Sequence, residues 1–188
     1  MEDPVKFITE EEYLAYDLKS DYKSEYYDGQ IMNMAGASEK HNTISVNIVS
    51  EMRVQLKKKD CQVYASDMRL KVENTGLYAY PDLLVVCSDK KFSGDKPDTL
   101  LNPVVILEIL SESTESFDRG AKFAHYRQIP SLREYVLISQ NEKKMEKYQL
   151  NSSGKWELEE TSEKNQKIEL SSIACILELS EVYDRVAL

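Results

Sequence analysis

Two acidic residues interrupt apolar segments of this chain. Glu108 stands inside Val104–Leu110, where every other residue is aliphatic, and Asp82 follows Pro81 and precedes the apolar segment Leu83–Val86. Both segments have the composition of buried strands, in which a single charge is costly unless a partner compensates it. Two such strands with one acid each indicate that two carboxylates meet at one site.

The alternation of side chains along a strand predicts how these acids are oriented. Glu108 shares a face with Ile106 and Leu110, and Asp82 shares one with Leu84 and Val86. If the two strands are neighbours in a sheet, the carboxylates lie side by side and repel each other unless a cation separates them. Carboxylate oxygens with room for water suit Mg²⁺ or Mn²⁺, so the sequence predicts a site for a divalent metal.

Lys122 is the third candidate for chemistry. It lies 14 residues after Glu108, in the helix expected after that strand. A helix packed on the same face of the sheet would direct the ammonium toward the acids, where it would orient a water and offset developing negative charge. The alternative is a surface lysine, and each acid could instead pair with a buried Arg or Lys or bind a backbone N–H.

Other polar residues have simpler interpretations. His41 and His125 fit partly exposed helix histidines, and Glu25, just before the Asp28-Gly29 turn, fits a surface acid on an edge strand. The cysteines, Cys61, Cys87 and Cys175, form no CxxC or Cys/His cluster, which argues against a zinc site and a disulfide framework. Cys87 is expected to pack as a small hydrophobic residue.

The elements that position these residues follow from periodicity and turn signals. Helices are expected over 9–19, 37–59 and 117–127, with a last one beginning at Ser180. Hairpins are expected over 24–34 and 145–160, and extended segments over 62–64, 68–72, 80–86, 104–110, 133–138 and 165–170. This order predicts an α/β fold with a mixed central sheet, in a single domain over residues 1–188 without an internal linker.

Composition limits the class of protein. Of the 188 residues 41% are hydrophobic and 30% charged, and the net charge is -9, which argues against a protein that simply coats nucleic acid. The basic runs Lys57–Lys59 and Lys143–Lys144 fit either a basic rim or solvated surface. Apolar runs are far shorter than the ~20 residues of a membrane span, and the acidic start Met1–Pro4 is unlike a signal peptide, so a cytoplasmic protein is expected.

The arrangement Pro81-Asp82, Glu108-Ile109-Leu110 and Lys122 resembles the PD-(D/E)XK nuclease superfamily. The lysine of that pattern normally stands two residues after the second acid, where this chain has Leu110, so Lys122 resembles a lysine moved to the next helix. A closer resemblance is to the Uma family of restriction endonucleases, over Glu25 to about Ser180. It rests on segments 25–29, 81–86, 107–114, 119–126 and 129–135 and on His41, with Glu112 departing from a proline common in the family.

The resemblance implies a restriction-endonuclease-like core and a metal-dependent endonuclease. Asp82 and Glu108 would hold Mg²⁺ or Mn²⁺, with the Ile109 carbonyl as a further ligand; Lys122 would be the catalytic lysine, and Glu25 would join the site. The substrate would be nucleic acid, with DNA the first expectation, and the protein a homodimer. The alternatives are a non-catalytic binding or assembly module that retains the fold, and a metal-dependent hydrolase of a small phosphoester.

Overall fold

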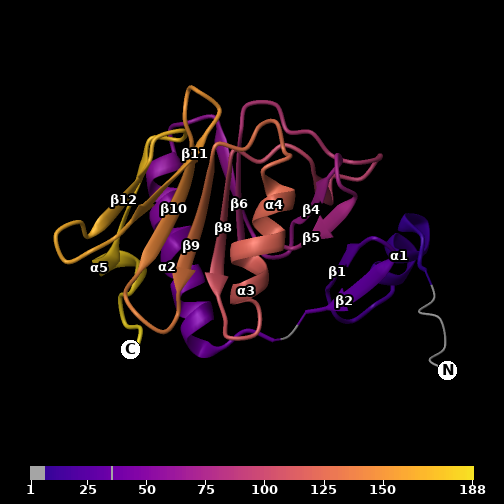
Figure 1. The fold of residues 1–188 in the computed structure, drawn as a ribbon, viewed down its shortest axis with the longest axis horizontal. Helices are drawn as coiled ribbons and strands as arrows, with labels where there is room; N and C mark the ends of the chain where they lie inside the picture. The colour runs from indigo at the N-terminus through magenta and orange to yellow at the C-terminus, as the bar shows by residue number, and fades with distance from the viewer. Residues whose placement is uncertain (1–6, 35) are drawn as a thin grey trace.

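The computed structural model describes residues 7–34 and 36–188 (Figure 1). The expectation about Met1–Pro4 concerns residues outside the described part. The helices are α1 (Glu10–Asp17), α2 (Glu39–Leu56), α3 (Glu115–Phe117), the π-helix η1 (Asp118–Lys122), α4 (Phe123–Tyr126) and α5 (Leu179–Val182). The predicted capping box begins α1, because Thr9 and Glu12 exchange side-chain-to-backbone hydrogen bonds.

The strands form three sheets. The five-stranded sheet has the order β2-β1-β5-β4-β7 and contains β1 (Ser24–Tyr27), β2 (Gln30–Asn33), β4 (Arg69–Val72), β5 (Leu77–Ala79) and β7 (Thr99–Leu100). The six-stranded sheet has the order β11-β10-β9-β8-β6-β3 and contains β3 (Cys61–Ala65), β6 (Leu83–Cys87), β8 (Val105–Leu110), β9 (Glu134–Ser139), β10 (Met145–Leu150) and β11 (Trp156–Glu160). A separate pair joins β12 (Lys167–Leu170) and β13 (Cys175–Glu178). Because β8 and β9 are parallel while β6 and β8 are antiparallel, the predicted mixed α/β fold is confirmed.

The six-stranded sheet is covered on both faces. The apolar stripe of α2, Ile44, Ile48, Met52 and Leu56, packs on the face that carries Leu83, Val85, Val105, Leu107 and Ile109. Phe123 and Tyr126 of α4 pack with Leu84, Ile106 and Leu110 of the other face. Glu108 shares a face of the strand with Ile106 and Leu110, so its side chain points toward the layer formed by α3, η1 and α4. The helix that carries Lys122 therefore lies over the acid that it was expected to reach.

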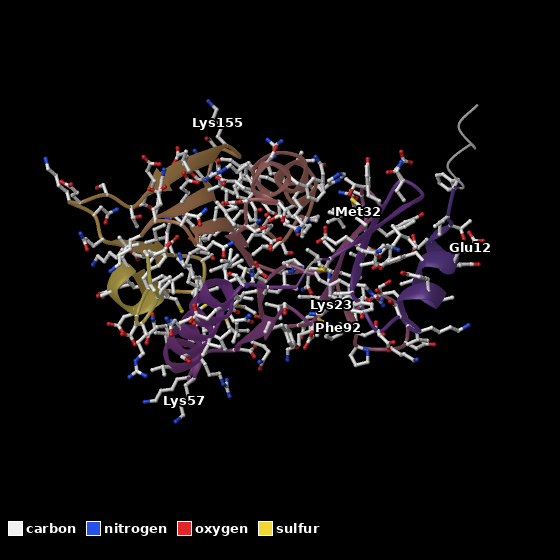
Figure 2. The ribbon with its side chains drawn as sticks, turned by 90° about the horizontal axis from the view of Figure 1, so that it is seen from below. Glu12, Lys23, Met32, Lys57, Phe92 and Lys155 are labelled. Atoms are coloured by element: carbon white, nitrogen blue, oxygen red, sulfur yellow. A yellow bond between two sulfur atoms is a disulfide. The ribbon has the colours of Figure 1, made fainter. Side chains whose placement is uncertain are left out.

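One edge of this sheet gathers the segments that carry the candidate residues. Figure 1 shows that β8 ends, and α2 begins, at the lower edge of the six-stranded sheet. The β1–β2 hairpin and α1 lie to the side of this sheet, at the right in Figure 1, next to β5. Figure 2 shows Lys57, just after α2, and Lys155, between β10 and β11, projecting on opposite sides. No helix in the described part of the chain is long and apolar enough to cross a membrane.

Several expectations need correction. The single helix expected over 117–127 is divided into α3, η1 and α4, and the strand expected over 80–86 begins only at Leu83. The strands β5, β7 and β13 were not predicted, because each is short and lacks a clear alternating pattern. The exclusion of a disulfide was wrong: Cys61 and Cys87 are direct partners in the β3–β6 register and are bonded to each other. The spacing of the cysteines did not reveal this pair, because β4 and β5, two strands of the other sheet, lie between β3 and β6 in the sequence.

Candidate active site

Asp82 and Glu108 meet at the start of β6. The antiparallel register pairs Leu83 with Leu107, so the next position places Asp82 opposite Glu108. The two residues are joined through the backbone: the Asp82 N–H donates to Glu108 Oε2 at 3.1 Å, and the Ile109 N–H donates to Asp82 Oδ2 at 2.8 Å. The prediction that two strands bring these acids together is confirmed.

The Ile109 carbonyl lies on the same side. Within a strand, the N–H and C=O of one residue point toward the same neighbouring strand. Since the Ile109 N–H points at Asp82, its carbonyl also points to the side of β6, beyond the point where β6 begins at Leu83. This edge therefore offers two carboxylates and one backbone oxygen.

Lys122 reaches the acids as the sequence predicted. Its Nζ lies 3.0 Å from Glu25 Oε1, 3.2 Å from Glu108 Oε1 and 3.2 Å from Asp118 Oδ1. All four side chains of this Lys122 cluster (Lys122, Glu25, Glu108 and Asp118) are buried. An ammonium has three N–H donors, and here it faces three carboxylates. The alternative of a surface lysine is therefore wrong.

Glu25 is not a surface acid on an edge strand. Its strand β1 lies between β2 and β5, and the carboxylate is buried against Lys122. The Tyr80 N–H also donates to Glu25 Oε1, at 3.4 Å. The β1–β2 hairpin thus delivers one acid of the cluster from a different sheet.

Burial controls the charge state of the cluster. Burial raises the pKa of the Glu108 carboxyl to about 8; Lys122 lowers it, while Asp118, Asp82 and Glu25 add to the increase. Burial alone would lower the pKa of the Lys122 ammonium, but Glu108, Glu25 and Asp118 together raise it well above its usual value. The lysine is therefore a cation at neutral pH, and the Glu108 carboxyl holds its proton more tightly than a solvent-exposed glutamate does.

His41, Asp118 and Tyr126 belong to the site although spacing alone did not assign them to it. His41 Nε2 lies 3.1 Å from Asp82 Oδ1, and these two side chains are only 17% and 14% exposed. The Tyr126 hydroxyl donates to Glu108 Oε1 at 2.9 Å. The sequence held a signal, because Asp118, Lys122 and Tyr126 recur at intervals of four on one helix face. His125 instead packs edge-on against Tyr27.

The donors fit a hard divalent cation. Three carboxyl groups, of Glu25, Glu108 and Asp118, face one lysine. Asp82 adjoins Glu108 as a fourth acid, so acids outnumber the lysine and a cation would offset the excess. Within residues 7–34 and 36–188, no group of three or more His, Cys, Asp or Glu side chains is arranged to hold a metal ion. Asp82, Glu108 and the Ile109 carbonyl would therefore share a cation with water, as Mg²⁺ commonly requires.

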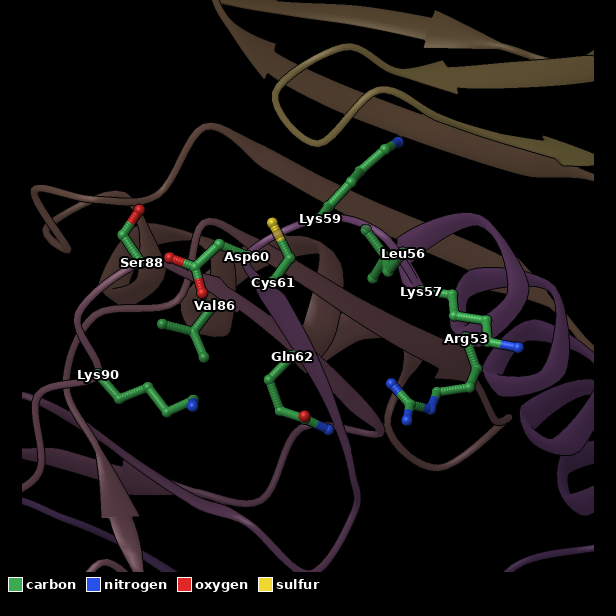
Figure 3. A pocket seen from close by; sticks show the side chains of 10 residues that line it. All are labelled: Arg53, Leu56, Lys57, Lys59, Asp60, Cys61, Gln62, Val86, Ser88 and Lys90. Carbon is green, nitrogen blue, oxygen red and sulfur yellow. The ribbon is translucent and has the colours of Figure 1, made fainter.

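A basic hollow lies at the opposite end of α2. Figure 3 shows its lining: Arg53, Leu56, Lys57, Lys59, Asp60, Cys61, Gln62, Val86, Ser88 and Lys90. Lysines suit this place because the carbonyl end of a helix attracts cations, and Lys59 donates to the Ile173 and Ala174 carbonyls. From His41 to Lys57 the helix rises about 24 Å, so the hollow is separate from the candidate active site.

The fold is shared with a solved protein. Over 98% of this chain and 100% of the other, the structure superposes with a TM-score of 0.78 on a protein from Anabaena variabilis ATCC 29413, described as "a putative nuclease belonging to DUF820". The two sequences are 19% identical, so the likeness shows the fold alone. The mixed sheets and flanking helices are therefore arranged as in that protein.

The chain belongs to the Uma2 family, whose model is described as "Putative restriction endonuclease" and matches residues 10–180. It is 36% identical over 166 residues to the uncharacterized protein sll1609 of Synechocystis sp. (strain ATCC 27184 / PCC 6803 / Kazusa), covering 88% of this chain and 94% of that protein. It is 33% identical over 186 residues to the uncharacterized protein slr1290 of the same organism, covering 98% and 95%. The resemblance to the Uma family is thus confirmed.

Proposed function

We propose that this chain is a metal-dependent endonuclease that hydrolyses phosphodiester bonds of nucleic acid, with DNA as the expected substrate. The observation that carries the proposal is the contact of the buried Lys122 ammonium with Glu108, whose neighbour across the strands is Asp82. Family membership supports the same reaction class. Two carboxylates beside one lysine supply the charges that phosphodiester hydrolysis requires.

Each residue has a defined task in this proposal. Asp82, Glu108 and the Ile109 carbonyl would hold Mg²⁺ or Mn²⁺. When bound there, such an ion lowers the pKa of a coordinated water and polarises a phosphate oxygen. Lys122 orients the attacking water and offsets the charge that develops on the phosphate, and Glu25 keeps the ammonium in place at 3.0 Å.

A cleavage assay tests the proposal. Purified wild type and Asp82→Asn are incubated with single- and double-stranded DNA and RNA, with Mg²⁺ or Mn²⁺ or with EDTA. We expect cleavage by the wild type with metal only, and none by Asp82→Asn. Equal cleavage by both proteins, or cleavage in EDTA, contradicts the proposal. Because related nucleases often act as pairs, we also expect a homodimer, which light scattering on the same samples would measure.

A non-catalytic binding or assembly module is the second candidate. The net charge of -9 favours it, because an acidic protein repels a polyanion. In a module of this kind the Lys122 cluster would serve stability alone, and calorimetry would detect no Mn²⁺ uptake that depends on Asp82. A hydrolase of small phosphoesters would instead bind Mn²⁺ and cleave nitrophenyl phosphoesters but not nucleic acid.

Mn²⁺ binding should depend on pH. The metal needs the Glu108 carboxylate, whose pKa is raised to about 8, so a bound proton competes below that value. We expect the apparent Kd for Mn²⁺ to fall about tenfold per pH unit from pH 6 to pH 8 and to level off above. Calorimetry at these pH values, repeated in buffers of different ionisation enthalpy, measures the affinity and the proton released. A Kd that is constant from pH 6 to pH 8 contradicts the assignment of Glu108 as a ligand.

A further inference from the structure

Asp118 occupies an unusual position. It is buried and stands at the first residue of the π-helix η1, whose last residue is Lys122. Asp118 Oδ1 lies 3.2 Å from Lys122 Nζ, and this atom has no hydrogen-bond partner among the described residues. This oxygen is therefore paired with the ammonium by charge and not by a hydrogen bond.

The cluster holds more acid than stability requires. One buried lysine needs one carboxylate as its partner, yet Glu25, Glu108 and Asp118 surround Lys122. Each additional buried carboxylate is desolvated and repels the others, so a third acid is unfavourable for folding alone. An unfavourable buried charge that persists beside reactive groups points to a role in the reaction.

The backbone around Asp118 fixes its direction. A π-helical turn is rare and is frequent at functional sites, and here it begins at Asp118 and ends at Lys122. The hydroxyl of the buried Tyr135, on β9, donates to the Asp118 carbonyl at 3.0 Å. Since β9 is the parallel neighbour of β8, this bond ties the start of the turn to the sheet that carries Glu108. Asp118 and Glu108 are therefore fixed relative to each other on two sides of Lys122.

We propose that Asp118 is a positioning residue that holds the Lys122 ammonium, with Glu25, in the direction from which it serves the phosphate. This inference rests on the proposed nuclease function. The ammonium lies within ion-pair distance of Glu25 (3.0 Å) and of Asp118 (3.2 Å), so these two carboxylates hold it by charge from two sides. Its third carboxylate neighbour is Glu108, on the side of the acid pair. Without Asp118 the lysine keeps its charge but loses its fixed direction.

Asp118→Asn tests the proposal, because it removes the charge and nearly preserves the shape. We expect kcat to fall by about 100-fold with KM changed less than about twofold, as for a misplaced catalytic group. The matched control is Glu115→Gln, which removes the i,i+4 ion pair between Glu115 and Arg119 (2.7 Å) on the exposed side of the same helical segment. The control should keep wild-type kcat. Equal kcat values in Asp118→Asn and wild type overturn the proposal.

A second measurement does not need nuclease activity. Acetylation of Lys122 by acetic anhydride, followed by mass spectrometry, should be about tenfold faster in Asp118→Asn than in wild type or Glu115→Gln, because the ammonium loses one carboxylate. Faster acetylation in a protein that cleaves no nucleic acid would refute the nuclease function and keep the positioning role. Unchanged acetylation refutes the positioning role itself.

Tyr135→Phe covers the case in which Asp118→Asn does not fold. It removes the hydroxyl that donates to the Asp118 carbonyl and leaves every charge of the Lys122 cluster in place. We expect the same two effects with smaller size: lower kcat at unchanged KM and faster acetylation of Lys122. Wild-type values of both in a folded Tyr135→Phe protein overturn the proposal.

Discussion

Lys122→Met should lower the free energy of unfolding by about 3–5 kcal/mol at pH 8, the expected effect of removing one partner from a buried ionic group. The lysine is buried and is in contact with Glu25, Glu108 and Asp118. Without the ammonium these carboxylates remain desolvated with no cation among them. Methionine fills a similar volume, so the loss reports charge rather than a cavity.

The pH dependence of this variant provides a check. Carboxylates without a cation hold their protons more tightly when folded than when unfolded, so stability falls as pH rises. The deficit of Lys122→Met relative to wild type should therefore be smaller at pH 5 than at pH 8. Urea denaturation at both values measures it, with Lys155→Met, at an exposed turn, as the control. A deficit below about 1 kcal/mol at pH 8 would mean that the cluster is solvated, contrary to this account.

Glu108→Gln should separate activity from stability. Cleavage is expected to fall about 1000-fold, because the variant loses a metal ligand and with it several kcal/mol of transition-state stabilisation. The fold should remain, since burial raises the pKa of Glu108 to about 8, which disfavours its charged form, and glutamine is a neutral group of the same shape. The change in unfolding free energy at pH 7 is expected to stay within about 2 kcal/mol, the scale of one altered buried hydrogen bond.

The sign of the pH effect follows from the two pKa values of Glu108. Unfolded, the carboxyl ionises near 4.5, whereas folded it keeps its proton until about pH 8. The folded state thus binds more protons between these values, and wild-type stability decreases as pH rises through this window. Glu108→Gln lacks this titration, so its stability relative to wild type should increase from pH 5 to pH 8. A relative stability that decreases over this range contradicts the raised pKa.

Local patterns were enough to predict much of the site. An acid within an aliphatic strand marks Glu108 as a special position from the sequence alone, because desolvation makes a carboxylate expensive there. The register of neighbouring strands was not in the sequence, but side-chain alternation predicted the correct face for Glu108. Lys122 was a candidate from its place in the helix after that strand, the resemblance to a nuclease pattern supported it, and the structure shows that this helix packs over the same face.

The features that were missed depend on contacts distant in sequence. His41 meets Asp82 only because α2 and β6 begin at the same edge of the sheet, and no local pattern encodes that approach. The Cys61–Cys87 bond depends on the β3–β6 pairing across an inserted sheet. The π-helix at Asp118 was not predicted, because one extra residue in a helical turn hardly changes the apolar periodicity from which a helix is predicted. That turn nevertheless connects Asp118 with Lys122.

Crystals of the wild-type protein soaked in Mn²⁺ at pH 8, measured for anomalous scattering, test the central claim most directly. The account predicts one strong anomalous peak between the carboxylates of Asp82 and Glu108, next to the Ile109 carbonyl, and no peak there in Glu108→Gln crystals treated in the same way. Two results would contradict it: Mn²⁺ bound at other positions with no anomalous peak between Asp82 and Glu108, or a peak of equal height at that place in the Glu108→Gln crystals.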